Sequence, residues 1–131
     1  QIEQQAFSEL LAATAPDVDD AEAPHMWTLG WGPDYADENN WVGDVLWCEG
    51  TGNRTKRACS EADDLIIQAR EETDPDARVE LYAQIEEMFF GPEGEYPFFP
   101  IYVQIQYQGI HTWYDFTPAL FGGNQWYNYS I

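Results

Sequence analysis

The stretch from Gly30 to Trp41, GWGPDYADENNW, brings aromatic rings and carboxylates together around a glycine–proline turn. A carboxylate beside flat ring faces can hold a ligand ammonium through a charge-assisted hydrogen bond and a cation–π contact. The sequence therefore indicates a ligand-binding site, whose candidate residues are Trp27, Trp31, Asp34 and Tyr35. The alternative is structural, with the rings filling the core and Asp34 capping the turn.

Catalysis has weaker support in the sequence than binding. Asp34 and Asp37 could flank a sugar bond, as the paired carboxylates of a glycosidase do. In so acidic a chain, however, two nearby carboxylates are expected by chance. The sequence carries no G-x-S-x-G, phosphate-cradling glycine loop or metal-ligand spacing. We expect a protein that is not an enzyme and has no cofactor and no metal site.

The charge of the chain restricts its partners. Asp and Glu number 24 against 5 Lys and Arg, which gives a formal net charge of −19. Nucleic acids and anionic membranes carry charge of the same sign, so neither is expected to bind. Salt screens the self-repulsion of such a chain. A salt-loving or marine source is therefore expected, with most carboxylates on the surface.

Two cysteines, Cys48 and Cys59, flank the flexible segment EGTGNRTKRA. This spacing favours a disulfide over a zinc site, which would require a tighter pair and further ligands. The alternative is a pair of free core thiols. A disulfide predicts a location outside the cytoplasm. The apolar stretches are too short to cross a bilayer. The beginning of the chain does not resemble a signal peptide, so we expect a processed protein or a piece of a longer one.

Three segments have the pattern of helices. Residues 2–14 form an amphipathic stretch that ends at Pro16, and Ser60 with Asp63 resembles a capping box. Asp74 is the expected N-cap of the third helix, which Gly91-Pro92 should end. The stripes expected to face the core are Ala62, Leu65, Ile66 and Ala69 in the second helix, and Val79, Tyr82, Ile85, Met88 and Phe89 in the third.

Two other segments have the pattern of strands. Residues 25–31 are short, apolar and aromatic, which predicts a buried strand, and residues 96–109 alternate apolar with polar side chains. The aromatic end of the chain, 111–131, is expected to be a short strand and an extended tail. Strand, helix, helix and strand make an α/β arrangement whose sheet is incomplete.

Several motifs in order resemble one known family. They are LGWGPDYADENNW, CSEADDLIIQAREETDPDARVELYAQIEEMFF, YPFFPIYVQIQYQGIHTWYDF and the final WYNYSI. The pattern is similar to that of the extracellular solute-binding proteins of ABC importers, family 5, whose members bind dipeptides, oligopeptides, nickel complexes or oligosaccharides. The resemblance covers most of the chain from Met26 onward and corresponds to the C-terminal part of such a protein.

The resemblance implies a fold and partners. The fold would be the C-terminal part of a two-lobed periplasmic-binding protein of type II, with 1–101 in the second lobe. Residues 102–107 would cross between the lobes, and 108–131 would return to the first lobe. The intact protein would lie outside the cell or in the periplasm, with a lipid anchor as one option. It would deliver a peptide, oligosaccharide or nickel complex to a membrane permease.

The resemblance also assigns roles to two site residues. In peptide-binding members, the aspartate at the position of Asp34 receives the ammonium of the ligand, and Trp31 stands at a pocket-lining position. The chain departs from the family between Ala13 and Met26, where a strand and helix are expected. Thr28 and Leu29 stand where some oligopeptide binders have an arginine. A secreted carbohydrate-binding module with stacked tryptophans is the alternative function.

Overall fold

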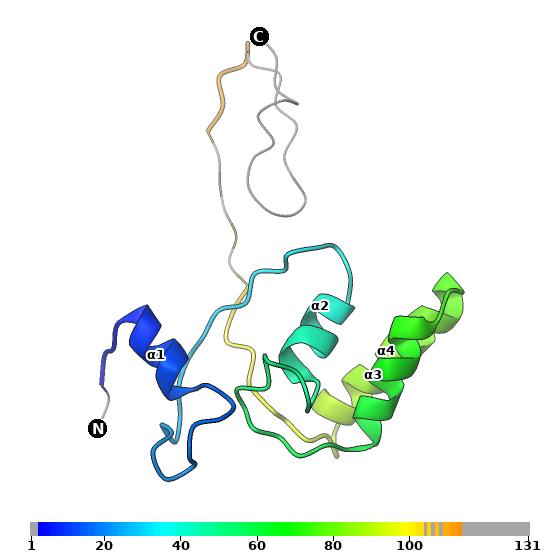
Figure 1. Ribbon diagram of the computed structural model, residues 1–131. Helices are drawn as coiled ribbons and strands as arrows, with labels where there is room; N and C mark the ends of the chain where they lie inside the picture. The colour runs from blue at the N-terminus through cyan, green and yellow to red at the C-terminus, as the bar shows by residue number, and fades with distance from the viewer. Residues whose placement is uncertain (1–2, 104, 106, 108, 114–131) are drawn as a thin grey trace.

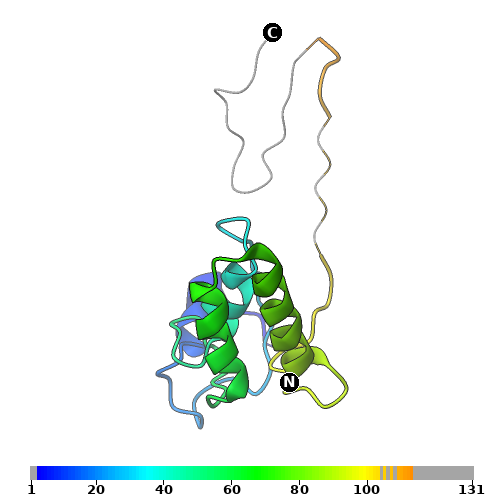
Figure 2. The same cartoon turned by 90° about the vertical axis from the view of Figure 1, so that its right-hand side faces the viewer.

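The computed structural model describes residues 3–103, 105, 107 and 109–113 of the chain. In chain order its helices are α1 (Phe7–Ala13), α2 (Asn39–Trp41), the π-helical turn η1 (Val42–Leu46), α3 (Glu61–Glu71) and α4 (Pro75–Phe90). Helices α3 and α4 lie side by side, with α2 and η1 packed against them (Figure 1). The view in Figure 2 shows the same helical body from its side.

Local capping sets the bounds of α3 and α4, as the sequence predicted. The Ser60 hydroxyl accepts a hydrogen bond from the Ala62 N–H, and the Asp63 carboxylate accepts one from the Ser60 N–H. Asp74 caps α4 through the N–H of Asp76 and of Ala77, while Pro75 takes the first helical position. These bonds satisfy N–H groups that no helix can pair internally. Helix α4 ends at Phe90, before Gly91-Pro92.

The core lies where η1, α3 and α4 meet. Its buried apolar residues are Val42, Leu46, Ala62, Ile66, Ala69, Tyr82, Ile85 and Phe89. Both predicted stripes are largely confirmed, with Leu65 and Met88 half-buried. The prediction for Val79 is wrong, since this side chain is 60% exposed. Arg78 lies next to it on the inner face of α4 and packs over the Tyr82 ring, so Val79 is turned toward solvent.

Helix α1 is shorter than the predicted 2–14 and buries none of its own residues. It begins at Phe7, where the Glu9 carboxylate accepts a hydrogen bond from the Ala6 N–H. Arg54 holds the C-terminal end of α1. The Arg54 guanidinium donates to the carbonyl of Leu11 and to the hydroxyl of the buried Thr14. Polar contacts, more than apolar burial, therefore attach α1 to the rest of the chain.

The segment between the cysteines, which we call the cysteine loop (residues 48–59), is closed by a disulfide. Cys48 and Cys59 are bonded with their Cα atoms 5.0 Å apart, which confirms the predicted pairing. Inside the loop, the Asn53 amide donates to the carbonyls of Cys48 and Arg57. Lys56 pairs with Asp20 at 2.9 Å and also donates to the Val18 carbonyl. The loop thus holds the preceding segment by charge as well as by its own bonds.

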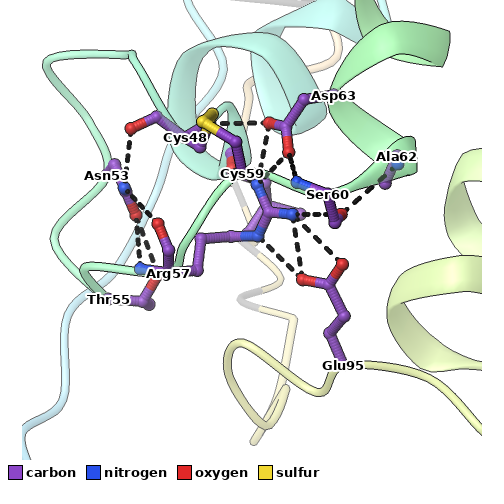
Figure 3. A network of polar contacts seen from close by, with 10 residues as sticks. Cys48, Asn53, Thr55, Arg57, Cys59, Ser60, Ala62, Asp63 and Glu95 are labelled. Carbon is purple, nitrogen blue, oxygen red and sulfur yellow. Dashed lines mark hydrogen bonds and ion pairs between the residues drawn. A yellow bond between two sulfur atoms is a disulfide. The ribbon is translucent and has the colours of Figure 1, made fainter.

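Arg57 makes the most extensive contacts of the cysteine loop (Figure 3). Its guanidinium donates to both oxygens of Asp63 at 2.8 Å and lies 2.9 Å from Glu95. It also lies over the Phe89 ring, 4.8 Å from the centroid. Burial alone would raise the pKa of Asp63, but hydrogen bonds from Arg57, Cys48 and Ser60 lower it overall. This network joins the cysteine loop, α3 and the turn after α4.

The predicted strands have no counterpart in the described part of the chain. Residues 25–31 and the described part of 96–109 do not form strands. The Tyr96 N–H donates to the Phe89 carbonyl at the end of α4, but no ladder of strand pairing forms among the described residues. After α4 the chain, yellow to orange, leaves the helical body (Figures 1 and 2). The apolar side chains that the structure describes between 99 and 107 are exposed. Much of the predicted tail, 114–131, lies outside the described residues, so the two-lobed α/β fold stays a prediction. In the part described, every helix is too short or too polar to cross a membrane.

Candidate functional site

Asn40, in α2, holds the aromatic loop (residues 30–38) through hydrogen bonds of its side chain. Its side chain is fully buried. The Asn40 Oδ1 accepts hydrogen bonds from the Trp31 indole Nε1 at 3.1 Å and from the Asp34 main-chain N–H at 3.0 Å. Its Nδ2 donates to Asp44 Oδ2 at 2.9 Å. Both ends of the amide are therefore satisfied, and the amide fixes one ring and one stretch of backbone at the site.

Tyr35 is fixed through its hydroxyl by two residues of the following helical segment. The hydroxyl donates to Asp44 Oδ2 at 2.9 Å and accepts from Asn39 Nδ2 at 2.8 Å. Asn39 packs tightly against Gly43, where a Cβ atom would overlap its amide. The loop and the α2–η1 segment thus form one hydrogen-bonded unit.

Asp37 anchors the end of the aromatic loop to α4. Its two oxygens lie 2.6 and 2.7 Å from the Arg78 guanidinium nitrogens, which is a bidentate ion pair. Arg78 also donates to the Ala69 carbonyl and to the Tyr82 hydroxyl. The Arg78 hydrogen bonds hold the pKa of Asp37 below its usual value, and the same pair raises the pKa of Arg78. Asp37 is therefore an ionised structural anchor, opposite in character to the protonated acid of a glycosidase.

Asp34 differs from Asp37 in having a free carboxylate. Its main-chain N–H is held by Asn40, but in the described part of the chain no group donates to its side-chain oxygens. The flanking rings are also accessible, with Trp31 39% and Tyr35 41% exposed. A carboxylate on a fixed backbone, in the same loop as two accessible rings, can receive a cationic group of a ligand.

Two shallow hollows border the aromatic loop. The larger, of about 330 Å³, is lined by Pro33, Tyr35, Ala36, Asp37, Glu38 and Trp41. The other, of about 250 Å³, lies between Tyr35, Asp37, Asn39, Arg70 and Arg78. Both are open to solvent on the described surface, so they can form only one wall of a closed site.

The structure brings three of the four predicted site residues together. Trp31, Asp34 and Tyr35 share the hydrogen-bonded unit around Asn40 and Asp44. Trp27 lies upstream and, among the described residues, shares no hydrogen bond or ring contact with them. The sequence analysis gave no role to Asn40, Asp44 or Arg78. Only their positions in the sequence pointed to them, because the first two closely follow the aromatic loop and Arg78 lies in the family-like motif CSEADDLIIQAREETDPDARVELYAQIEEMFF.

Cys48, Cys59 and Asp63 lie close enough together to suggest metal ligands. The two sulfurs are bonded to each other, however, and a disulfide offers no thiolate to a metal ion. Asp63 is also occupied by Arg57 and by the Ser60 and Cys48 N–H groups. This cluster is therefore structural.

Comparison with known proteins relates the chain distantly to peptide-binding proteins. It is 32% identical over 106 residues to Di/tripeptide-binding protein 1 of Pseudomonas aeruginosa (strain UCBPP-PA14), covering 79% of this chain. It is 31% identical over 102 residues to Di/tripeptide-binding protein 3 of the same strain, covering 76% of this chain. The chain spans only 19% of the length of each relative. No family model matches it, and no solved structure matches it significantly.

The two relatives belong to the same class of protein. Both are named as binding proteins, and both names specify short peptides. A short peptide in solution carries an ammonium at one end, which is the kind of group that the free Asp34 carboxylate can receive.

Proposed function

We propose that this chain forms part of a solute-binding protein of an ABC importer, family 5, and that the aromatic loop is one wall of its peptide site. Asp34 would receive the peptide ammonium, while Trp31 and Tyr35 flank the peptide with their rings. The single observation that carries the proposal is the free carboxylate of Asp34 on a backbone fixed by Asn40. The similarity to two di/tripeptide-binding proteins supports it.

The rest of the site would come from a part of the protein beyond this chain. The relatives are about five times as long as the matched region. The hollows beside the aromatic loop are open, and the apolar side chains of 99–107 that the structure describes are exposed. Both features are expected where the first lobe closes over the solute and pairs with the segment leaving the helices. Capture would take place outside the cytoplasm, where the disulfide is stable, and a permease would receive the solute.

The test is the affinity of the intact protein for di- and tripeptides with Asp34→Asn. Removing one partner of a desolvated charge-assisted hydrogen bond costs about 1.5–3 kcal/mol, so the Kd should rise about 10- to 150-fold. The matched control is Glu86→Gln, which removes one negative charge from an exposed side chain of α4 that lines neither hollow. This control should bind peptides as the wild type does, by calorimetry.

Two outcomes would contradict the proposal. Equal weakening by Asp34→Asn and Glu86→Gln would mean that only the overall negative field attracts peptides. Binding of an oligosaccharide in place of peptides, with loss on Trp31→Ala but none on Asp34→Asn, would favour the carbohydrate-binding alternative. The half-exposed Trp31 ring is the residue on which such stacking would depend.

A further inference from the structure

We propose that Asn40 is the positioning residue of the peptide site, which holds Trp31 and Asp34 in the arrangement that the solute meets. This inference rests on the proposed function of the aromatic loop and adds a residue that acts through others. Asn40 is fully buried, whereas Trp31 and Asp34, the two residues it holds, are exposed. A ligand at Asp34 therefore meets the carboxylate and the rings, and does not touch the amide that fixes them.

The hydrogen bonds of Asn40 explain why this position favours an asparagine. Its one oxygen accepts from both the Trp31 Nε1 and the Asp34 N–H, so an acceptor is required on that side. Its nitrogen donates to Asp44 Oδ2, so a donor is required on the other side. An amide supplies both in a planar group, while a carboxylate or a hydroxyl of similar size supplies a different set.

The second arm of the amide extends the effect to Tyr35. Asp44 Oδ2 accepts from Asn40 and from the Tyr35 hydroxyl, so one carboxylate oxygen joins the two. Three of the residues predicted to contact the solute are therefore connected to one buried side chain. The Asp37–Arg78 pair holds the end of the same loop to α4, which leaves the Trp31–Asp34 half dependent on Asn40.

Positioning of this kind contributes to affinity by lowering the entropy lost when the ligand binds. Without the acceptor of Asn40, the Trp31 ring and the Asp34 backbone could sample other conformations, and binding would have to order them. The loss should therefore appear in peptide affinity and in the exchange of the Trp31 indole proton. Global stability should also fall, because the freed N–H groups lose a buried partner.

The first experiment compares Asn40→Ala with Asn53→Ala in the intact protein. Asn53 is the matched control, since it is also a buried asparagine with several hydrogen bonds but lies in the cysteine loop. Asn40→Ala should raise the Kd for a tripeptide at least tenfold. It should also speed the hydrogen exchange of the Trp31 indole N–H, whose NMR signal is identified by its disappearance in Trp31→Phe. Asn53→Ala should leave both unchanged in the folded protein, even where it lowers the melting temperature as much.

The second experiment restores the complementarity and remains informative where Asn40→Ala fails to fold. Asn40→Asp keeps the acceptor for Trp31 and Asp34 but places a carboxylate against Asp44, and it should weaken peptide binding. Adding Asp44→Asn returns a donor to the pair, and it should recover at least half of the lost binding free energy. Recovery of binding and of slow indole exchange together would support positioning by Asn40.

The outcomes separate this inference from the proposed function. A wild type that binds peptides, with Asn40→Ala or Asn40→Asp binding equally well, overturns the positioning role alone. Equal loss of affinity in Asn40→Ala and Asn53→Ala also overturns it, because the effect would then be general loosening. A folded wild type that binds no peptide overturns the proposed function, and this inference falls with it.

Discussion

The cysteine loop and the aromatic loop differ in whether their charged side chains are paired. In the cysteine loop, Arg57 is buried and every part of its guanidinium is paired, with Asp63, Glu95, Ser60 and the Leu46 carbonyl. In the aromatic loop, Asp34 has its backbone fixed while its carboxylate stays free and exposed. A buried charge must be fully paired or it destabilises the fold, whereas a free carboxylate at the surface is available to a ligand.

The basic residues in the cysteine loop and the one bound to the aromatic loop also hold different segments of the chain. Three of the five basic residues, Arg54, Lys56 and Arg57, stand in the cysteine loop, and each holds another segment of the chain. Arg78 holds the aromatic loop to α4. Since four of the five cations are used internally, the remaining acidic surface has little counter-charge within the described residues. Cationic groups of a solute are the natural partners of such a surface.

The largest expected effect is on the cysteine loop. Arg57→Met should lower the free energy of unfolding by about 3–5 kcal/mol, because it leaves the buried Asp63 carboxylate without its cation. Peptide affinity of the folded protein should not change, as measured by calorimetry below the melting temperature. Arg70→Met is the control, since this exposed arginine has no ion pair among the described residues and only lies over the Trp47 ring, and it should cost no more than about 1 kcal/mol. Equal effects of the two variants would contradict the account.

Opening the disulfide should have the next largest effect. Cys48→Ser with Cys59→Ser should lower the free energy of unfolding by about 2–3 kcal/mol, through the greater freedom of the unfolded chain. Reduction of the wild type should give the same loss, measured by chemical denaturation. The aromatic loop should again keep its peptide affinity. A loss of affinity in the folded double variant would show that the two loops are coupled.

A smaller effect is expected for the Asp37–Arg78 pair, and it should depend on pH. The pKa of Asp37 is below its usual 3.8 in the folded protein, so its stabilisation is present above about pH 4. As the pH falls, the unfolded state takes up the proton first, and the stabilisation is lost. The stability difference between the wild type and Asp37→Asn, about 1–2 kcal/mol at pH 7, should therefore shrink toward pH 3. A difference that stays constant over this range would contradict the ion pair.

The smallest effects should come from salt, with opposite signs for folding and binding. About 1 M KCl shortens the Debye length to about 3 Å, which weakens both self-repulsion and the attraction of exposed charges. The melting temperature should rise because the chain carries a net charge of −19. Peptide affinity should fall a few-fold because Asp34 is exposed. Salt that moved both in the same direction would contradict the separation of the two loops.

The features predicted from the sequence are those set by near neighbours. The caps at Ser60 and Asp74, the end of α4 and the disulfide all depend on residues a short distance apart in the chain. The apolar stripes were also predictable, because helical spacing fixes which side chains share a face. Val79 failed this rule because the neighbouring Arg78 takes the inward position in that turn of α4, where it packs over Tyr82 and pairs with Asp37.

The features that the sequence could not supply depend on distant contacts. Arg78 and Asp37 lie 41 residues apart, and Arg54 lies 43 residues from the Leu11 carbonyl it binds. No local rule pairs such residues in a chain with so many carboxylates to choose from. The predicted strands need neighbouring segments, and a strand pattern without a partner leaves an extended chain. Trp31, Asp34 and Tyr35 were found by residue type, but the residues that fix them were not.

The central claim is that Asp34 receives the ammonium of a peptide, and the peptide itself offers the most direct test. A tripeptide with a free N-terminus and its N-acetylated form would be titrated by calorimetry into the intact wild type and into Asp34→Asn. Acetylation removes the positive charge and adds an acetyl group at the same nitrogen, and the steric effect of that group is common to both proteins. The account predicts at least a tenfold loss of affinity on the wild type and less than a threefold loss on Asp34→Asn. The same loss on both proteins would place the ammonium elsewhere and contradict the account.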